Sequence, residues 1–410
     1  MAIELEVDEP VVPADEVGRR PWHIPMTGRD PTEAHRASTP LELLFDLCFV
    51  VAVAQAGAAL HHDLADGNVL HGLVAFAVVF FAIWWPWMNF TWFASAYDTD
   101  DVQYRLLTFV QIAGVLVVAA GVPAAFDDSN FTIMVVGYVI MRIGLVPQWL
   151  RAAREDPPGR PVALRFATAI TLIQIGWILR LALGNSDIGY LAFLVLGGLD
   201  LAVPAWAERA GRGTPWHPEH IVERYGLFTI IVLGECVLAT STAVQAAFRA
   251  GGELPELLTV AVGGLLLVFA LWWAYFKHRP NVGHHRSLNA MIGWGYGHYF
   301  IFASVAALGA GLQIAAESTH EDIALGITAT ALTVAVPVAV FLIADGAVHI
   351  QRRTLVAGAP IAVTIVLVLL AALLAPSIGV PLSVLMMGLI VCGLVAALIV
   401  LLARPERALS

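Results

Sequence analysis

Charged side chains are scarce in this sequence. They account for 13% of the 410 residues, whereas a soluble globular chain carries about 25%. Hydrophobic residues make up 59% of the chain. A globular core of this size does not need so many apolar side chains, so a large share of them must face lipid. The composition therefore excludes an ordinary soluble protein and predicts an all-α polytopic membrane protein.

Cysteine is also rare. The three cysteines, Cys48, Cys236 and Cys392, lie inside apolar runs and show neither metal-ligand nor disulfide spacing. They are predicted to be small packing residues.

Histidines gather at two places, in the pair His61–His62 and in the group His278, His284 and His285. Either group has the residue type of a metal site, but loops in a histidine-containing chain give such groups often. No metal ion and no cofactor is therefore predicted.

Several catalytic and binding motifs are missing. There is no H-E-x-x-H motif, which argues against a zincin-type membrane protease, and no G-x-S-x-G motif of a serine hydrolase. A phosphate-binding P-loop is absent too, so no nucleotide-driven pump is indicated. The net charge of -10 comes without a basic patch, so no nucleic-acid partner is predicted.

What the sequence does contain is a series of long apolar runs. Each is long enough to span a bilayer, which takes roughly 17 to 25 residues. Since no water satisfies backbone groups inside lipid, the runs should be helices. About twelve transmembrane helices are predicted, at residues 41–60, 69–93, 103–122, 131–150, 164–183, 189–206, 220–247, 257–276, 291–315, 323–345, 357–375 and 381–403.

The loops give the orientation. Lysine and arginine accumulate on the cytoplasmic side of membrane proteins. With twelve spans and a cytoplasmic N-terminus, Arg249 is the single basic residue that falls in an outside loop. Both termini are therefore predicted to be cytoplasmic. The expected organisation is a mobile tail (1–38) without a cleavable signal, a first six-helix half (39–206), a second half (207–403) and a short tail (404–410).

The two halves show a weak internal repeat. Six spans per half give both halves the same orientation, which predicts a parallel 6+6 repeat of the kind found in several transporter folds. The matching positions are Trp84-Trp85 with Trp272-Trp273, Gly121 with Gly309, and Glu42 with Glu223.

One carboxylate stands in the middle of an apolar run. The run begins with polar residues near His220, and Glu235 follows about 22 Å further along the helix axis. Its side chain is too short to reach water from there. Glu235 is therefore either a neutral side chain hydrogen-bonded to a neighbouring helix, or a group that binds and releases a proton or a substrate.

The first run also begins with acids. Thr39, Pro40 and Glu42 form a predicted capping box, with Glu42 reaching back to the helix start. Asp46 lies one turn deeper on the same face, too far inside to cap the helix. A charge at a helix centre costs on the order of 2.5–3.5 kcal/mol. Asp46 should therefore face the bundle interior and have a partner, in either a functional or a structural role.

Arg142 is the cation placed furthest inside a span. It is the natural partner for Asp46 or Glu235, and Asp200, at comparable depth, is a third candidate. The proton- or substrate-binding group is therefore predicted to be Asp46, Glu235, Arg142 and Asp200.

A second group of polar residues should lie at the cytoplasmic mouth. Glu223 and Arg224 begin the seventh span and are candidates for an interfacial salt bridge. His298, in the ninth span, is either a proton-relay group or a satisfied core histidine. The predicted mouth residues are Glu42, His220, Glu223, Arg224 and His298.

Two motifs carry a family resemblance. Together, in this order and spacing, they resemble the bacterial low temperature requirement protein A family over the chain from about residue 35 onward. The resemblance implies a multi-pass protein of the bacterial plasma membrane, named for growth in the cold, and supplies no substrate. The motifs are Ser38-Thr39-Pro40-Leu41-Glu42-Leu43-Leu44-Phe45-Asp46-Leu47 with Phe49-Val50-Val51-Ala52, and His220-Ile221-Val222-Glu223-Arg224-Tyr225-Gly226-Leu227-Phe228 with Leu233-Gly234-Glu235.

Three functions remain open from the sequence. The first is a proton- or ion-coupled secondary transporter that uses buried acids, with membrane lipid and a small solute or ion as partners. The second is a receptor, scaffold or lipid-binding protein that supports growth in the cold. The third is a membrane-embedded lipid-modifying enzyme, which would need a wet cleft with convergent polar groups. The oligomeric state stays open.

Overall fold

The computed structural model describes residues 22–31, 33, 36–251, 253–277, 288–320, 323–349 and 355–403, and this part of the chain is helical without a strand. The helices are α1 (Pro40–Ala65), α2 (Val69–Tyr97), α3 (Val102–Ala120), α4 (Val122–Asp127), α5 (Thr132–Glu155), α6 (Arg160–Leu181), α7 (Asp187–Ala207), α8 (Pro218–Arg249), α9 (Leu254–Phe276), α10 (Leu288–Glu317), α11 (Ile327–Val348), α12 (Leu355–Leu373), α13 (Ala375–Ile378) and α14 (Val380–Ala403).

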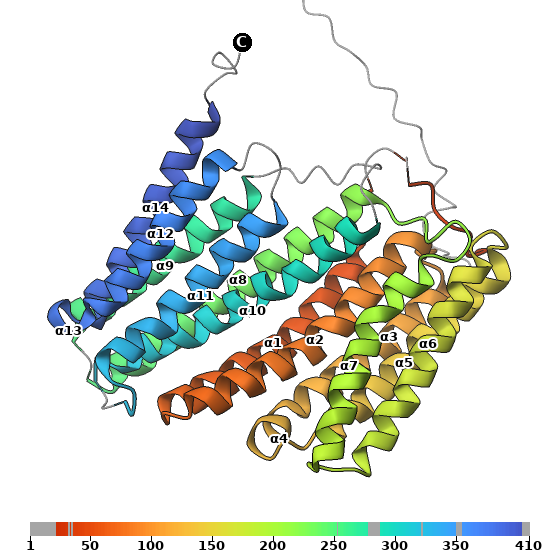
Figure 1. Ribbon diagram of the computed structural model, residues 1–410, viewed down its shortest axis with the longest axis horizontal. Coiled ribbons are helices and arrows are strands. Elements are labelled where there is room, and N and C mark those ends of the chain that lie inside the picture. The colour runs from red at the N-terminus through yellow and green to blue at the C-terminus, as the bar shows by residue number, and fades with distance from the viewer. Residues whose placement is uncertain are drawn as a thin grey trace, which may run out of the picture.

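Each predicted apolar run coincides with one long helix, and α4 and α13 are short helices between runs. Within the described residues, eleven helices are long and apolar enough to cross a membrane. The apolar stretch of α12, Gly358–Leu373, is shorter, although α12 runs the length of the bundle beside α11 and α14 (Figure 1). The all-helical, multi-spanning class is confirmed, whereas the count of twelve spans stays a prediction.

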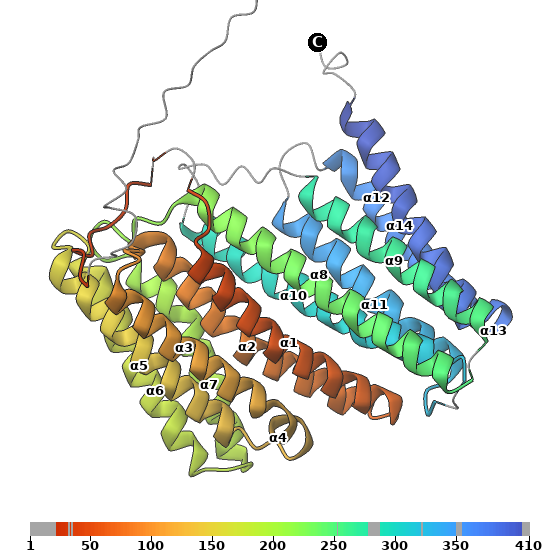
Figure 2. The same cartoon turned by 180° about the vertical axis from the view of Figure 1, so that it is seen from behind.

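The helices form two groups, α1–α7 and α8–α14, which lie side by side in Figures 1 and 2. Helix α1 packs on α2 and α3 of its own group and on α8 and α10 of the other. The contact between the groups therefore centres on α1, α8 and α10.

The helix bundle has two ends. The Thr39 end carries Thr39, Asp101 and His217, which precede α1, α3 and α8, and the Ala65 end carries the last residues of α1 and α10. The segment from Trp22 and the last turn of α14 both lie at the Thr39 end (Figures 1 and 2). That arrangement fits an even number of crossings.

Glycines set the closest helix contacts. A methyl group on Gly137 of α5 would lie 2.7 Å from the Gly114 carbonyl oxygen of α3, and one on Gly388 of α14 would lie 2.8 Å from the Gly263 carbonyl oxygen of α9. Such distances leave no room for a side chain. These pairs bring backbones together, which is how membrane helices gain packing energy without a hydrophobic driving force between them.

The described residues between Trp22 and Thr39 cross the Thr39 end before α1 begins. The Ile24 amide donates to Asp101 (2.8 Å), the Met26 amide donates to Glu155 (2.6 Å), and the Met26 side chain is fully buried. The Arg36 guanidinium donates to the Ser95 carbonyl and, at 2.8 Å, to the Ala94 carbonyl. The segment is thus attached to α2, α3 and α5. The rest of the predicted N-terminal tail and residues 404–410 lie outside the described residues.

Candidate functional site

A cluster of buried charges joins α1 to α8 near the Thr39 end. The Arg224 guanidinium of α8 lies between two carboxylates of α1, with Nη1 3.0 Å from Glu42 Oε1 and Nη2 2.5 Å from Asp46 Oδ1. His220, one turn before Arg224, has Nε2 3.2 Å from Glu42 Oε1. All four side chains are fully buried. We call Glu42, Asp46, His220 and Arg224 the Arg224 cluster.

Local structure explains how α1 presents both acids. The predicted capping box is confirmed, with the Glu42 amide donating to Thr39 Oγ1 (3.3 Å) and the Thr39 amide donating to Glu42 Oε2 (2.8 Å). Asp46 follows four residues later and therefore lies on the same face of the helix. The Trp87 indole of α2 donates to Asp46 Oδ1 at 2.7 Å.

The cluster is not fully satisfied. Within the described residues, Asp46 Oδ2 and Arg224 Nε have no hydrogen-bond partner. Desolvation of ions is costly, and a buried pair offsets that cost only when its geometry is good. Removing one charge from this cluster would leave the others uncompensated in an apolar surrounding. The Arg224 cluster is therefore a structural contact between the two helix groups.

Aromatic rings cover the cluster on the side facing the middle of the bundle. The Trp87 ring stacks on Phe228 with centroids 4.3 Å apart, and Phe302 meets Phe228 edge-on at 4.9 Å. Tyr225 packs against Trp87 at 4.9 Å. These rings come from α2, α8 and α10, so an aromatic layer spans the contact between the two groups.

Beyond the aromatic layer, toward the Ala65 end, lies a cavity of about 270 Å³. Segments of α1, α8 and α10 line it. Its polar side chains are Glu235, Gln55, Gln313 and Thr242, and the rest of the lining is apolar, mostly alanine and glycine. Glu235 is half-buried and, within the described part of the chain, has no hydrogen bond or ion pair. We call this space the Glu235 cavity.

A second ion pair joins the two groups at the Ala65 end. His61 Nε2 of α1 lies 2.7 Å from Glu317 Oε2 of α10. Both side chains keep partial access to solvent. The Glu235 cavity thus lies between two ionic contacts, and each of them connects α1 to the second helix group.

Two of the three predicted partners of Arg142 are wrong. Asp46 pairs with Arg224, and Glu235 faces the cavity, so neither forms a pair with Arg142. The Arg142 guanidinium lies 5.5 Å from the centroid of the Tyr138 ring and interacts electrostatically with Asp200, the third candidate. The reason is positional: Arg142 is on α5, and α5 packs against α3 and α6, away from α8.

Asp200 is buried in the first helix group. Its Oδ2 accepts a hydrogen bond from the Trp177 indole of α6 at 2.8 Å. Arg142 and Asp200 therefore belong to α5–α7 and lie apart from the Arg224 cluster and the Glu235 cavity. The four residues predicted as one binding group divide into three places.

Glu223 and Arg224 do not pair with each other as an interfacial salt bridge. Glu223 is exposed and its Oε1 accepts from the Ser38 amide (3.2 Å), whereas Arg224 points inward. Asp46 and Arg224 both stand on the second turn of a helix that begins at the Thr39 end. The sequence therefore indicated that they lie at a similar depth, but not that α1 packs beside α8.

His298 is a core histidine with both ring nitrogens occupied. Its Nδ1 lies 2.8 Å from the Trp294 carbonyl oxygen and its Nε2 lies 3.1 Å from the Tyr275 hydroxyl. It contacts the Tyr225 ring and not the Arg224 cluster. Of the predicted mouth residues, Glu42, His220 and Arg224 come together, while Glu223 and His298 stand apart.

Outside the spanning segments, the Thr39 end carries a network of buried charged side chains. Burial raises the pKa of Asp98 to about 6, Glu42 adds to the rise, and Arg36, whose Nη2 lies 3.6 Å from Asp98 Oδ2, opposes it. Burial also acts to raise the pKa of Asp101, but hydrogen bonds from Arg151 and from the Tyr104 and Ile24 amides together outweigh it and leave that pKa below its usual range. The two acids therefore respond to different pH ranges.

The helices, the buried charges and the absence of strands in the described residues define a multi-pass α-helical membrane protein. A family model described as Bacterial low temperature requirement A protein (LtrA) matches residues 37–401. The chain therefore belongs to the LtrA family, and the predicted resemblance is confirmed.

A curated relative gives no activity. The chain is 30% identical over 264 residues to a protein of Rhizobium meliloti (strain 1021) described as uncharacterized. The match covers 62% of this chain and spans 61% of the relative's length. No solved structure matches the chain.

Proposed function

We propose that this protein is a secondary transporter that couples movement of a small solute or ion to protonation of Glu235. The observation that carries the proposal is the Glu235 cavity, in which a carboxylate and three other polar side chains meet between α1, α8 and α10. An ionised carboxylate without a partner at membrane depth has a high free energy. Binding a proton or a cation there lowers that cost, and release restores it.

The two ionic contacts give the proposal a mechanism. Alternating access requires one end of the site to close while the other opens. The Arg224 cluster with its aromatic layer closes the cavity toward the Thr39 end, and the His61–Glu317 pair bridges the groups at the Ala65 end. In this scheme Asp46 is part of a closing contact, not the coupling acid, and Arg142 does not balance its charge.

The finer topology belongs to the same proposal. Twelve spans in two six-helix halves, with both termini in the cytoplasm, place the Thr39 end inside the cell. Helix pairing supports the repeat: in each half the first span packs on the second and third, and the third to sixth spans pack in chain order. These pairs are α1–α2, α1–α3, α3–α5, α5–α6 and α6–α7, matched by α8–α9, α8–α10, α10–α11, α11–α12 and α12–α14.

Proton flux in proteoliposomes tests the function. The full chain is reconstituted with a pH-sensitive dye inside the vesicles, and an imposed pH gradient is followed with and without candidate solutes. Glu235→Gln should abolish the protein-dependent flux, whereas Glu256→Gln, at an exposed acid in the first turn of α9, should leave it unchanged.

The same experiment separates the rival functions. If wild-type flux equals that of protein-free vesicles, or if Glu235→Gln transports like wild type, the transporter role of Glu235 is wrong. A scaffold would show a lower melting temperature for Glu235→Gln without any flux to lose.

A further inference from the structure

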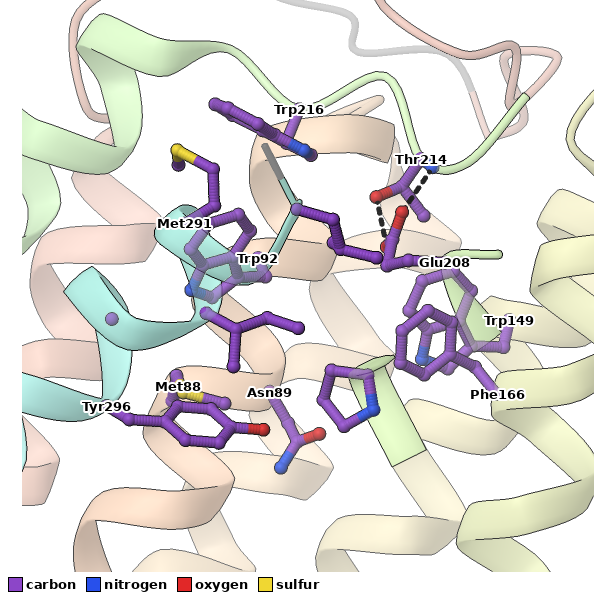
Figure 3. A pocket seen from close by; sticks show the side chains of 14 residues that line it. Met88, Asn89, Trp92, Trp149, Phe166, Glu208, Thr214, Trp216, Met291 and Tyr296 are labelled. Carbon is purple, nitrogen blue, oxygen red and sulfur yellow. Dashed lines mark hydrogen bonds between the residues drawn. The ribbon is translucent and has the colours of Figure 1, made fainter. Parts of the chain in front are cut away.

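A second pocket lies near the Thr39 end, apart from the Glu235 cavity. It lies where α2, α5, α6, α7 and α10 approach the loop that precedes α8 (Figure 3). Trp92, Trp149, Trp216 and Tyr296 supply most of its aromatic surface, and Glu208 and Thr214 lie at its rim. We call it the Trp92 pocket.

The aromatic rings are held in place by their neighbours. The Trp92 indole donates to the Tyr225 hydroxyl at 3.0 Å, and its ring meets Trp216 edge-on with centroids 5.3 Å apart. Trp149 stacks on Phe166 at 4.4 Å. A ligand therefore finds these rings already positioned, which reduces the entropy lost on binding.

Among the described residues, Glu208 is the one charged side chain that lines the pocket, and no described lysine or arginine lines it. The Thr214 hydroxyl donates to Glu208 Oε1 (2.6 Å) and the Thr214 amide donates to Oε2 (2.9 Å), as the dashed lines in Figure 3 show. Within the described residues no ion pair neutralises this carboxylate. Thr214 sets the orientation of the Glu208 carboxylate, but no described residue supplies a counter-ion for its charge.

The chemistry of the lining selects the ligand. Faces of tryptophan and tyrosine attract cations and recognise quaternary ammonium groups in particular. The sulfur atoms of Met88 and Met291 add polarizable contacts.

We propose that the Trp92 pocket binds the trimethylammonium group of an organic cation, with the aromatic rings around the methyl groups and Glu208 as the counter-ion. The group can come from a free cation such as choline or from the headgroup of a choline lipid. The proposal does not depend on transport, because the pocket shares no lining residue with the Glu235 cavity.

Calorimetric titration of choline chloride into the full chain in maltoside detergent tests the site. The neutral isostere 3,3-dimethylbutan-1-ol has the same shape without the charge and should bind at least 10-fold more weakly. Glu208→Gln and Trp216→Leu should each weaken choline binding at least 10-fold. The matched controls are Glu219→Gln, at an exposed acid in the first turn of α8, and Trp206→Leu, at an exposed tryptophan of α7; both should bind like wild type.

Three results overturn the proposal. They are no heat of binding with choline at millimolar concentration, equal binding of the isostere, and an unchanged affinity in Glu208→Gln. If Trp216→Leu does not fold, the milder Trp216→Phe takes its place. Because Phe keeps an aromatic face, this variant should bind choline with an affinity closer to wild type than that of Glu208→Gln.

Nanodiscs distinguish the two sources of the cation. In discs of phosphatidylglycerol alone, added choline should bind as it does in detergent. If a lipid headgroup is the occupant, choline binding disappears when one fifth of the lipid is phosphatidylcholine. If the occupant is a free cation, the affinity is the same in both discs. Absence of choline binding in phosphatidylglycerol discs as well as in detergent contradicts both sources.

Discussion

The Arg224 side chain of α8 is held between Glu42 and Asp46 of α1, at 3.0 Å and 2.5 Å, without exposure to solvent. The two helices are separated by most of the first half of the chain. A single guanidinium therefore connects the helix groups where the proposed pathway is closed. Breaking this contact must either open the pathway or destabilise the fold.

Loss of the Arg224 charge should destabilise the folded protein. Arg224→Gln leaves two buried carboxylates facing each other and should lower the free energy of unfolding by about 3–5 kcal/mol. Combining it with Asp46→Asn removes one of these charges and should cost less than Arg224→Gln alone. Equilibrium unfolding in mixed micelles, followed by circular dichroism, measures both values. The control Arg249→Gln alters an exposed residue of α8, and an equal effect of the two single changes would refute the role of the cluster.

The buried charged side chains at the Thr39 end should make stability depend on pH. The folded-state pKa of Asp98, about 6, lies above the unfolded value of about 3.9. Asp98 therefore favours the folded state below pH 4, and this contribution disappears as the pH rises through 6. Through Asp98, the wild-type protein should lose about 1–3 kcal/mol of unfolding free energy between pH 4.5 and 7. The Asp98→Asn variant should not show this part of the loss.

Chemical unfolding of the protein in detergent at several pH values checks the Asp98 prediction. Asp101 does not interfere in this range, because its pKa lies below the usual value and its contribution is lost only at lower pH. Asp127→Asn changes an exposed acid at the end of α4 and should keep the wild-type pH dependence. A steep pH dependence in Asp98→Asn would assign the effect to another group.

The His61–Glu317 contact should move during transport. Cysteines at positions 61 and 317, in a chain whose three native cysteines are alanine, should be joined by a short bis-methanethiosulfonate reagent. The link holds α1 to α10 and should stop flux, and a reductant should restore it. Cysteines at Asp63 and His71, whose side chains are 2.9 Å apart, join α1 to α2 inside one group and should leave flux intact. Full flux in the 61–317 linked protein would exclude this contact as a gate.

Helix contacts that depend on glycine should not accept a larger side chain. Gly137→Val forces a branched side chain against the backbone of α3 and should destabilise the protein by about 1–3 kcal/mol. Gly197→Val, on α7 where no atom lies within 4 Å of the added Cβ, should stay close to wild type. Melting temperatures from size-exclusion chromatography of heated samples compare the two, and equal losses would contradict the close approach of α3 and α5.

Sequence patterns located the helices and the polar groups but not their partners. The start of α1 at Thr39 followed from the capping box, because that motif involves residues within one turn. The depth of Asp46 and Glu235 followed from their distance to the nearest polar residue along one helix. The pairing of Asp46 with Arg142 failed, because depth alone does not tell which helix lies alongside.

The Trp92 pocket illustrates the same division. Its tryptophans fit the usual pattern of aromatic residues near a membrane interface, so the sequence offered no reason to group Trp92 with Trp149 or Trp216. Only the packing of α2, α5 and the loop before α8 brings them around Glu208.

By itself the sequence determined that this is a multi-spanning helical protein, where its helices lie, and which acids stand within the apolar runs. Those properties follow from local rules: a run must be long enough to cross the bilayer, and its backbone must satisfy its own hydrogen bonds. Only the tertiary structure decided that Arg224 meets Glu42 and Asp46 and that Glu235 faces a cavity. The reason is that lipid-facing and core-facing surfaces are both apolar, so the pattern along a membrane helix does not reveal which face meets which neighbour.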